Sequence, residues 1–252
     1  MFDLSDRVAI VTGGNGGIGL GMARGLAKAG ARGVVAARNA EKSNAAVLEL
    51  KSLGCDALAI AVDVVDESSV DALVTETVRK CGRLDILVNN AGINIRKPAQ
   101  ELALDEWRQV MDTNLTSAFL CSRSAYPHMK KIGGGKIINI GSMLSLFGAP
   151  YAPAYGASKG GIVQLTQSLA VAWASDNIQV NAVLPGWIDT ELTRRAREQV
   201  KGLHERVLSR SPSGRWGGLD DFEGIAVFLA SSASTFITGV AIPVDGGYSS
   251  LG

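Results

Sequence analysis

The sequence has few cysteines and no excess of charge of either sign. Its 252 residues include three cysteines, Cys55, Cys81 and Cys121, and the formal net charge at pH 7 is +1. Because the thiols are odd in number and widely spaced, we expect them to be reduced and structural, not part of a disulfide framework or a zinc site. A nearly neutral chain offers no basic stripe to neutralise a row of phosphates, which argues against a nucleic-acid or anionic-membrane surface.

Long apolar runs are missing too, and histidine is scarce. No stretch approaches the roughly 18 unbroken apolar residues of a membrane span, and the opening residues MFDLSDR do not resemble a signal peptide. We therefore predict a cytoplasmic protein that does not partner with membranes. His128 and His204 have no acidic or cysteine neighbours at ligand spacing, so no metal is assigned.

Apolar runs of strand length recur along the chain and alternate with amphipathic segments of helix length. The runs span residues 7–12, 33–37, 57–62, 85–89, 136–141, 178–184 and 240–244. Residues 66–81 place their apolar side chains on one face, with acids early and bases late, as in a capped surface helix. The alternation predicts one α/β domain over residues 1–252, a doubly wound Rossmann-type sheet of seven parallel strands with helices on both faces.

Residues 190–218 are the one weakly patterned stretch, rich in arginine, serine and glycine. Two interpretations are open for this segment. It is either a mobile substrate lid or a polar surface loop that contains a helix.

The glycine-rich segment TGGNGGIG, residues 12–19, lies between a predicted strand and a predicted helix at 18–29. Two registers fit it, Gly14-x-Gly16-x-x-Gly19 and Thr12-Gly13-x-x-x-Gly17-x-Gly19. In either register, backbone N–H groups at a helix N-terminus can accept a pyrophosphate, which approaches closely where Cβ atoms are absent. The alternative is a tight turn without a ligand, but the strand-to-helix context favours a dinucleotide cofactor.

The second predicted strand ends in GVVAARN, where a Rossmann site selects its cofactor. An acid at this point binds the ribose 2′-hydroxyl of NAD(H), whereas an arginine accommodates the 2′-phosphate of NADP(H). Ala37 occupies the place of the acid and Arg38 follows it, so we predict a preference for NADP(H), with NAD(H) as the alternative. Arg38 has no second basic partner in this run, and a solvated arginine is the rival interpretation. Glu41 is expected in the first turn of a surface helix.

The segment APAYGASKGG, residues 152–161, places Tyr155 and Lys159 four apart at the start of a predicted helix, so both side chains project from one face. A nearby ammonium favours the phenolate, and we expect it to lower the pKa of Tyr155 from about 10 toward a value useful for proton transfer. Ser142 ends a preceding strand, where its hydroxyl could orient a substrate oxygen. Taken alone, a surface pair would explain the tyrosine and lysine equally well.

Taken in order, these motifs resemble those of the short-chain dehydrogenases/reductases over nearly the whole chain. The motifs are Thr12-Gly13-x-x-x-Gly17-x-Gly19, NNAG at 89–92, Asn114, Ser142, Tyr155-x-x-x-Lys159, PG at 185–186 and VDGG at 244–247. The resemblance implies that Tyr155 is the general acid/base, that Ser142 holds the reacting oxygen, and that Lys159 binds the nicotinamide ribose and lowers the tyrosine pKa. Asn114 would support a water leading from Lys159 to solvent.

The same resemblance implies a set of cofactor contacts. Asp63 and Val64 would border the adenine, while Ile188 and Thr190 would hold the carboxamide. The full set comprises Gly13, Asn15, Gly17, Ile18, Gly19, Arg38, Asp63, Val64, Asn90, Ala91, Gly92, Tyr155, Lys159, Pro185, Gly186, Ile188 and Thr190. Three structural roles are weighed beside it: a helix cap for Asp63, a turn-stabilising hydroxyl for Thr12, and a tie between strands for Asn89.

The reaction that this resemblance implies is reversible hydride transfer between nicotinamide and a secondary alcohol or ketone. Arg96 and Lys97 lie just past the fourth predicted strand and could bind a substrate carboxylate. Trp187 is expected either to border the substrate or to be core. The loop around Arg96 resembles bacterial family members that act on sugar acids, so a sugar, sugar acid or polyol is predicted.

Two rival functions stay open at this point. In a 3-oxoacyl-carrier-protein reductase or a broad ketone reductase, the same motifs recur, and Arg194, Arg195 and Arg197 could face an acidic carrier. A sensor that binds NADP(H) without turnover belongs to another class, and an intact set of four catalytic side chains speaks against it. The resemblance also implies a homotetramer.

Overall fold

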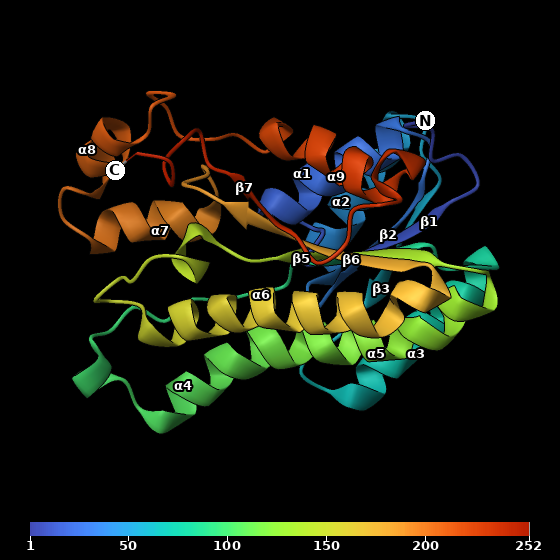
Figure 1. The fold of residues 1–252 in the computed structure, drawn as a ribbon, viewed down its shortest axis with the longest axis horizontal. Coiled ribbons are helices and arrows are strands. Elements are labelled where there is room, and N and C mark those ends of the chain that lie inside the picture. Colours follow the sequence, from blue (N-terminus) through green and yellow to red (C-terminus); the bar gives the residue numbers. More distant parts are fainter. Residues whose placement is uncertain (252) are drawn as a thin grey trace.

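The computed structural model describes residues 1–251 and shows one parallel sheet of seven strands (Figure 1). The strands are β1 (Val8–Thr12), β2 (Arg32–Ala37), β3 (Ala57–Ala61), β4 (Ile86–Asn89), β5 (Gly135–Ile140), β6 (Ile178–Pro185) and β7 (Ala241–Val244). Their order in the sheet is β3-β2-β1-β4-β5-β6-β7, with every pairing parallel. The predicted doubly wound fold is confirmed, and each predicted strand is found within about one residue of its expected ends.

Helices cover both faces of the sheet, as predicted (Figure 1). They are α1 (Gly17–Lys28), α2 (Ala40–Ser52), α3 (Glu67–Cys81), α4 (Leu104–Met111), α5 (Ser117–Lys131), α6 (Pro153–Trp173), α7 (Glu191–Gln199), α8 (Leu203–Arg210) and α9 (Glu223–Ala230). Helices α1, α2 and α9 pack on one face, and α3, α5 and α6 pack on the other. Asp66 caps α3 by accepting a hydrogen bond from the Ser68 N–H, and Gly82 ends the helix in a left-handed conformation.

Strand β1 shows why the strands read as continuous apolar runs. All five of its residues are buried. Ala9 and Val11 join the core beneath α1 and α9, whereas Val8 and Ile10 join the core beneath α3 and α5. Because successive side chains of a strand point to opposite faces, a sheet covered on both sides needs apolar residues at every position.

The strand order determines where a ligand-binding crevice can form. Strands β1 and β4 are neighbours although α1, β2, α2, β3 and α3 separate them in the sequence. The chain winds outward in one direction from β1 and in the other from β4, so the loops after these strands diverge and leave a crevice at their carboxyl ends. Ligand-facing loops of an open parallel sheet gather at such a crevice.

The segment 190–218 forms helices α7 and α8 beside this crevice. A small apolar cluster of Ala196, Leu203 and Val207 joins the two helices, and Trp187 and Trp216 pack against it. The segment therefore has a core of its own in addition to its polar surface. No helix in residues 1–251 combines the length and apolar character that a membrane crossing requires. The three cysteines are free thiols.

Candidate active site

A cavity of about 470 Å³ lies at the carboxyl ends of the central strands. The glycine-rich turn after β1 forms one wall, and the starts of α6 and α7 form others. Of the residues predicted to bind a cofactor, it is lined by Gly13, Asn15, Gly17, Ile18, Asn90, Ala91, Gly92, Tyr155, Lys159, Pro185, Gly186, Ile188 and Thr190. Segments that are far apart in the sequence thus converge on one cleft.

The geometry of the glycine turn distinguishes the two registers left open by the sequence. Gly13 and Gly17 have φ angles of +62° and +52°, which L side chains rarely adopt. At Gly19 a Cβ atom would lie 2.4 Å from Asn90 Nδ2, whereas nothing lies within 4 Å of one at Gly16. The left-handed φ angles at Gly13 and Gly17 support the register Gly13-x-x-x-Gly17-x-Gly19. Gly19, which both registers share, serves close packing behind the cleft.

Thr12 and Asn90 hold this turn against the end of β4. Thr12 Oγ1 donates a hydrogen bond to the Val88 carbonyl and accepts one from each of the Asn90 and Ala91 N–H groups. The Asn90 amide donates to the carbonyls of Thr12 and Gly13. The turn-stabilising role weighed for Thr12 agrees with these contacts, and Asn90 shapes the turn as well as lining the cleft.

Asn89 has the structural role that the sequence suggested. Its buried amide donates hydrogen bonds to Asn139 Oδ1 on β5 and to Ser122 Oγ on α5. The side chain therefore joins β4 to β5 and to α5, and it does not line the cavity.

Four residues of the predicted cofactor set do not line the cavity: Gly19, Arg38, Asp63 and Val64. Val64 is buried in the core, and Arg38 is exposed after β2. Asp63 accepts a hydrogen bond from the Val65 N–H. The cap of the following helix is Asp66, so the alternative role of Asp63 as that cap is wrong.

Ser142, Tyr155 and Lys159 line the same cavity, as the spacing predicted. Ser142 follows β5, is 8% exposed, and its Oγ accepts a hydrogen bond from the Leu144 N–H. Tyr155 and Lys159 project from the first turns of α6, which begins at Pro153, a favourable first residue of a helix. One loop and one helix thus bring a hydroxyl, a phenol and an ammonium to one end of the cleft.

The expected lowering of the tyrosine pKa by Lys159 is not found. Burial raises the pKa of Tyr155 above its ordinary value, and the Ser142 hydroxyl and the Arg96 guanidinium act in the opposite direction. The Lys159 ammonium lies 5.6 Å from the centre of the Tyr155 ring and donates a hydrogen bond of 2.6 Å to the Ile140 carbonyl. Burial lowers the pKa of Lys159 to about 8.

Asn114 lies in a π-helical turn, Asp112–Thr116, between α4 and α5. Its side chain is buried, donates to the Ile93 carbonyl and to Ser158 Oγ, and accepts from the Ile93 N–H. These bonds fix the backbone just after NNAG relative to α6. A π-turn of this kind re-aims one side chain of a long helix and is frequent at functional sites.

Beside the main cleft is a small cavity of about 60 Å³ that Ser142 and Tyr155 also line. Arg96 lies in its wall, half-buried, and donates hydrogen bonds to Gln199 Oε1 and to the Leu192 carbonyl. Within residues 1–251 no carboxylate forms an ion pair with Arg96, and burial lowers its pKa. Lys97 instead forms an ion pair with Glu106. Of the two cations predicted to bind a carboxylate, only Arg96 is therefore without a carboxylate partner in the described chain.

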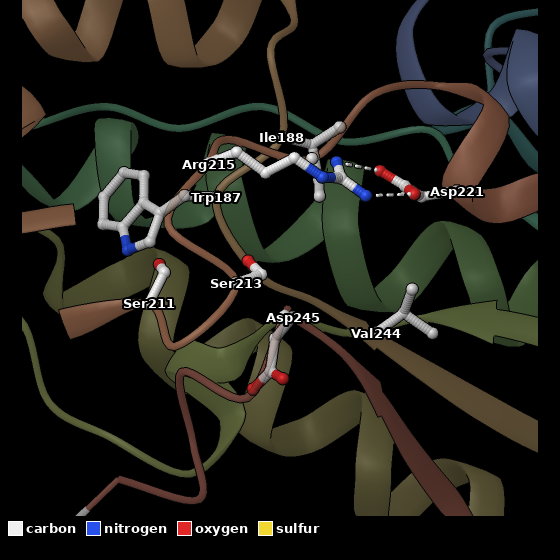
Figure 2. Close-up of a pocket in the computed structure, with 10 residues that line it drawn as sticks. Trp187, Ile188, Ser211, Ser213, Arg215, Asp221, Val244 and Asp245 are labelled. Atoms are coloured by element: carbon white, nitrogen blue, oxygen red, sulfur yellow. Dashed lines mark hydrogen bonds and ion pairs between the residues drawn. The ribbon is translucent and has the colours of Figure 1, made fainter. Parts of the chain in front are cut away.

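Trp187 borders this small cavity and also a second cavity of about 190 Å³ (Figure 2). Its ring packs edge-on against Trp216 at 5.7 Å. In the described chain, Trp187 Nε1 and Asn94 Oδ1 are buried atoms without a hydrogen-bond partner. Since buried polar atoms are normally paired, two residues in the wall of the small cavity retain unused hydrogen-bonding capacity.

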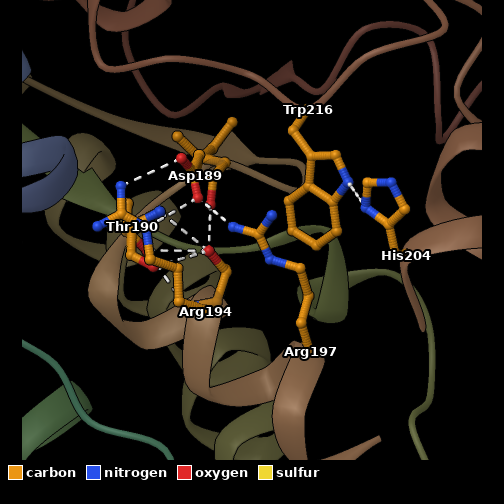
Figure 3. A network of polar contacts seen from close by, with 8 residues as sticks. Asp189, Thr190, Arg194, Arg197, His204 and Trp216 are labelled. Carbon is orange, nitrogen blue, oxygen red and sulfur yellow. Dashed lines mark hydrogen bonds and ion pairs between the residues drawn. The ribbon is translucent and has the colours of Figure 1, made fainter. Parts of the chain in front are cut away.

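Trp216 and Asp189 organise the segment above the site (Figure 3). The indole lies 4.4 Å from the Arg197 guanidinium and donates to His204 Nδ1 at 3.1 Å. Asp189 forms ion pairs with both Arg194 and Arg197, and the pKa of its carboxyl is lowered, mainly by the hydrogen bond from Arg194. The contacts link the start of α7 to α8 and to the loop that follows it.

Some cleft residues were missed by the sequence reasoning. They are Gly16, Lys42, Ile93, Asn94, Ile140, Gly141, Glu191, Leu192, Thr193 and Arg195. Most of them adjoin a motif and could have been found by extending each motif by two or three positions. Lys42 carried no such signal, because only the packing of α2 beside the glycine turn brings it to the cleft.

The comparisons with known proteins cover almost the whole chain. A sequence profile of the family described as Enoyl-(Acyl carrier protein) reductase matches residues 13–249. The chain is 38% identical to a 2-dehydro-3-deoxy-D-gluconate 5-dehydrogenase of Formosa agariphila over 98% of this chain and 94% of that protein. It is 39% identical to a gluconate 5-dehydrogenase of Gluconobacter oxydans over 98% of this chain and 96% of that protein.

A solved structure agrees closely with the fold. The gluconate 5-dehydrogenase of Burkholderia cenocepacia, in complex with NADP and tartrate, superposes with a TM-score of 0.94 at 40% identity. The match covers 99% of this chain and 97% of that one. A likeness of this extent includes the glycine turn, the serine loop, the helix that carries the tyrosine and the segment above them.

Proposed function

Since the chain belongs to the short-chain dehydrogenase/reductase family and is an NAD(P)-dependent oxidoreductase, we propose that it interconverts a hydroxyl and a keto group of a sugar acid with NADP(H). The observation that carries the substrate class is Arg96. This half-buried guanidinium lies in the cavity of Ser142 and Tyr155 and forms no ion pair within residues 1–251. A substrate carboxylate would supply the missing charge and could accept two hydrogen bonds from the planar guanidinium.

The cleft fits a dinucleotide. The left-handed Gly13 and Gly17 keep side chains out of the turn, and α1 begins at Gly17, so its first N–H groups lack intrahelical acceptors. These groups and the positive end of the helix dipole suit a pyrophosphate. Lys159, Ile188 and Thr190 line the same cavity and would hold the nicotinamide half.

When bound, NADP(H) supplies or accepts the hydride. The protein's own part is to position the substrate and to move one proton. Tyr155 would donate its phenolic proton to the substrate oxygen during reduction and recover it during oxidation. Ser142 would hold that same oxygen, so that two hydroxyl groups stabilise the negative charge that develops there. Asn114 would act indirectly, because its bonds fix Ile93 and Ser158 around the site.

The polar wall of the small cavity supports a hydroxylated substrate. Asn94 and Trp187 each retain a buried atom without a partner in the described chain, and substrate hydroxyl groups can both donate and accept. The relatives from Formosa agariphila and Gluconobacter oxydans are named as 5-dehydrogenases of gluconate derivatives. We infer a six-carbon sugar acid that reacts at C5, with its carboxylate at Arg96.

The cations that were expected to face an acidic carrier protein are paired with carboxylates of the chain itself. Lys97 pairs with Glu106, Arg194 and Arg197 pair with Asp189, and Arg195 pairs with Glu191. An acidic carrier would have to compete with these internal partners. Arg96 in the small cavity, by contrast, forms no ion pair within residues 1–251, which favours a small carboxylate substrate.

The direct test is a substrate panel read by absorbance of the reduced cofactor. We expect turnover of 5-keto-D-gluconate with NADPH and of D-gluconate with NADP⁺. The matched control is 5-oxohexanoate, which has the same carboxylate and ketone positions but no hydroxyl groups, and which should react more slowly. Good activity on neutral ketones with none on any keto acid would contradict the sugar-acid assignment.

We also propose that the enzyme is a cytoplasmic homotetramer. Val171 on α6 and Phe119 on α5 are exposed by 83% and 41%, which leaves apolar side chains on one helical layer for a partner subunit. The free thiols suit a reducing compartment. Light scattering coupled to size-exclusion chromatography tests the assembly, and a monomer at micromolar concentration would contradict it.

A further inference from the structure

One carboxylate and two cations in the wall of the main cleft form a triad. Glu191, at the start of α7, pairs with Lys42 on α2 at 3.2 Å and with Arg195 on α7 at 2.6 Å. All three residues line the cavity of the glycine turn. The Lys42–Glu191 pair therefore joins two helices across the place where the proposed cofactor would bind.

The ion pairs of this triad contribute little to stability because their side chains are exposed to solvent. The side chains of Lys42 and Glu191 are exposed by 59% and 63%, and exposed pairs of this kind add little to stability. The two cations hold the pKa of the Glu191 carboxyl below its usual range, so it is charged at neutral pH. A phosphate that enters the cleft is repelled by the Glu191 carboxylate, which has the same sign of charge. Lys42 and Arg195 can exchange this carboxylate for the phosphate at little cost in free energy.

Lys42 also lies beside the glycine turn. Asn15, in that turn, donates hydrogen bonds to Ser43 Oγ at 3.2 Å and to the Asn39 carbonyl. Asn39 caps α2 by accepting from the Lys42 N–H. Lys42 is thus attached through one turn of α2 to both the phosphate-binding turn and the end of β2, where the ribose phosphate of NADP(H) is selected.

We propose that Lys42 is a specificity-determining residue for the 2′-phosphate of NADP(H), and that Glu191 holds it in reserve until the cofactor enters. On binding, Lys42 exchanges the carboxylate for the phosphate and the link between α2 and α7 is released. The run that ends β2 contains only one basic residue, Arg38. Lys42 would supply the second basic group for the 2′-phosphate. This inference rests on the proposed function only for the identity of the cofactor.

The test measures binding by titration calorimetry, with four probes and no substrate. Lys42→Met is compared with Lys51→Met, which removes an exposed lysine from the last turn of the same helix. We expect Lys42→Met to weaken NADP⁺ and 2′,5′-ADP roughly fivefold while NAD⁺ and ADP change less than about twofold. Lys51→Met should leave all four affinities unchanged.

Glu191→Gln is the second variant, with Glu198→Gln on the exposed part of α7 as its control. Glu191→Gln should tighten NADP⁺ binding roughly twofold to fivefold, because it removes both the competing partner and the repulsion. Equal weakening of NADP⁺ and NAD⁺ by Lys42→Met would place the lysine on the pyrophosphate and overturn the assignment, as would unchanged binding of NADP⁺. Because no sugar acid is present, a failed substrate panel leaves this result unaffected.

Discussion

The Lys159 ammonium lies over the ring of Tyr155, 5.6 Å from its centre, and gives its hydrogen bond to the Ile140 carbonyl and not to the phenol. The cation thus faces the ring, while Ser142 and Arg96 are the groups that favour the phenolate. The Tyr-x-x-x-Lys spacing suggested that Lys159 both binds the cofactor and lowers the tyrosine pKa, but the structure assigns these two roles to different residues. Ser142 and Arg96 tune the phenol, and Lys159 is held against the strand end, where it lines the cofactor cleft.

Tyr155→Phe should abolish most of the activity without disturbing the cleft. The change removes one hydroxyl and keeps the ring that packs beside Lys159. We expect kcat to fall by roughly a hundredfold to ten-thousandfold, the usual range for loss of a general acid or base. The affinity for NADP⁺, measured by titration, should stay within about twofold. Near-normal turnover of the variant would remove Tyr155 from the proposed role.

The pH dependence of oxidation follows from the raised pKa of Tyr155. Oxidation needs the phenolate to accept the proton of the alcohol, so kcat should rise with pH through the neutral and alkaline range. Ser142 and Arg96 lower this pKa, so Arg96→Met should move the rising limb to higher pH. Rate profiles at saturating substrate for both proteins provide the measurement. A shift of the limb to lower pH would contradict the assigned charge effect.

Arg96→Met and Lys97→Met form a matched pair of adjacent substitutions. Only Arg96 lines the cavity, whereas Lys97 is paired with Glu106. We expect Arg96→Met to raise KM for 5-keto-D-gluconate roughly tenfold to a hundredfold, the cost of losing hydrogen bonds to a carboxylate. Lys97→Met should change KM less than about twofold. If both variants behaved alike, the carboxylate site would be elsewhere.

Gly19→Ala tests the packing behind the glycine turn. A Cβ atom at this position would lie 2.4 Å from Asn90 Nδ2 and 2.6 Å from the Gly13 carbonyl oxygen. We expect the free energy of unfolding to fall by about 1–3 kcal/mol, as for other overpacked sites. Gly224→Ala on α9 is the control, because nothing lies near its Cβ position and alanine favours helix by about 0.5–1 kcal/mol. Denaturant titration of both variants gives the comparison, and equal stability would refute the contact.

Much of the fold and part of the site could be predicted from local pattern. The strands of the central sheet were recognisable because burial on both faces requires apolar residues at successive positions, as in β1. The spacing of Tyr155 and Lys159 predicted a common helix face, which α6 confirms. The direction of the pKa shift of Tyr155 could not be predicted from the sequence. It depends on whether the Lys159 ammonium contacts the phenol or a backbone carbonyl, and side-chain geometry decides this.

The amino-acid order by itself determined the element types, the parallel sheet and the glycine-rich turn after β1, since these follow from periodicity and from residues with special backbone freedom. Tertiary structure alone decided which cations are free. Arg96 and Lys97 are adjacent in the chain, yet one faces the cavity and the other meets Glu106. It also brought Lys42 to Glu191 across the cleft. Such pairings join elements far apart in sequence, and their distances arise only when the helices pack.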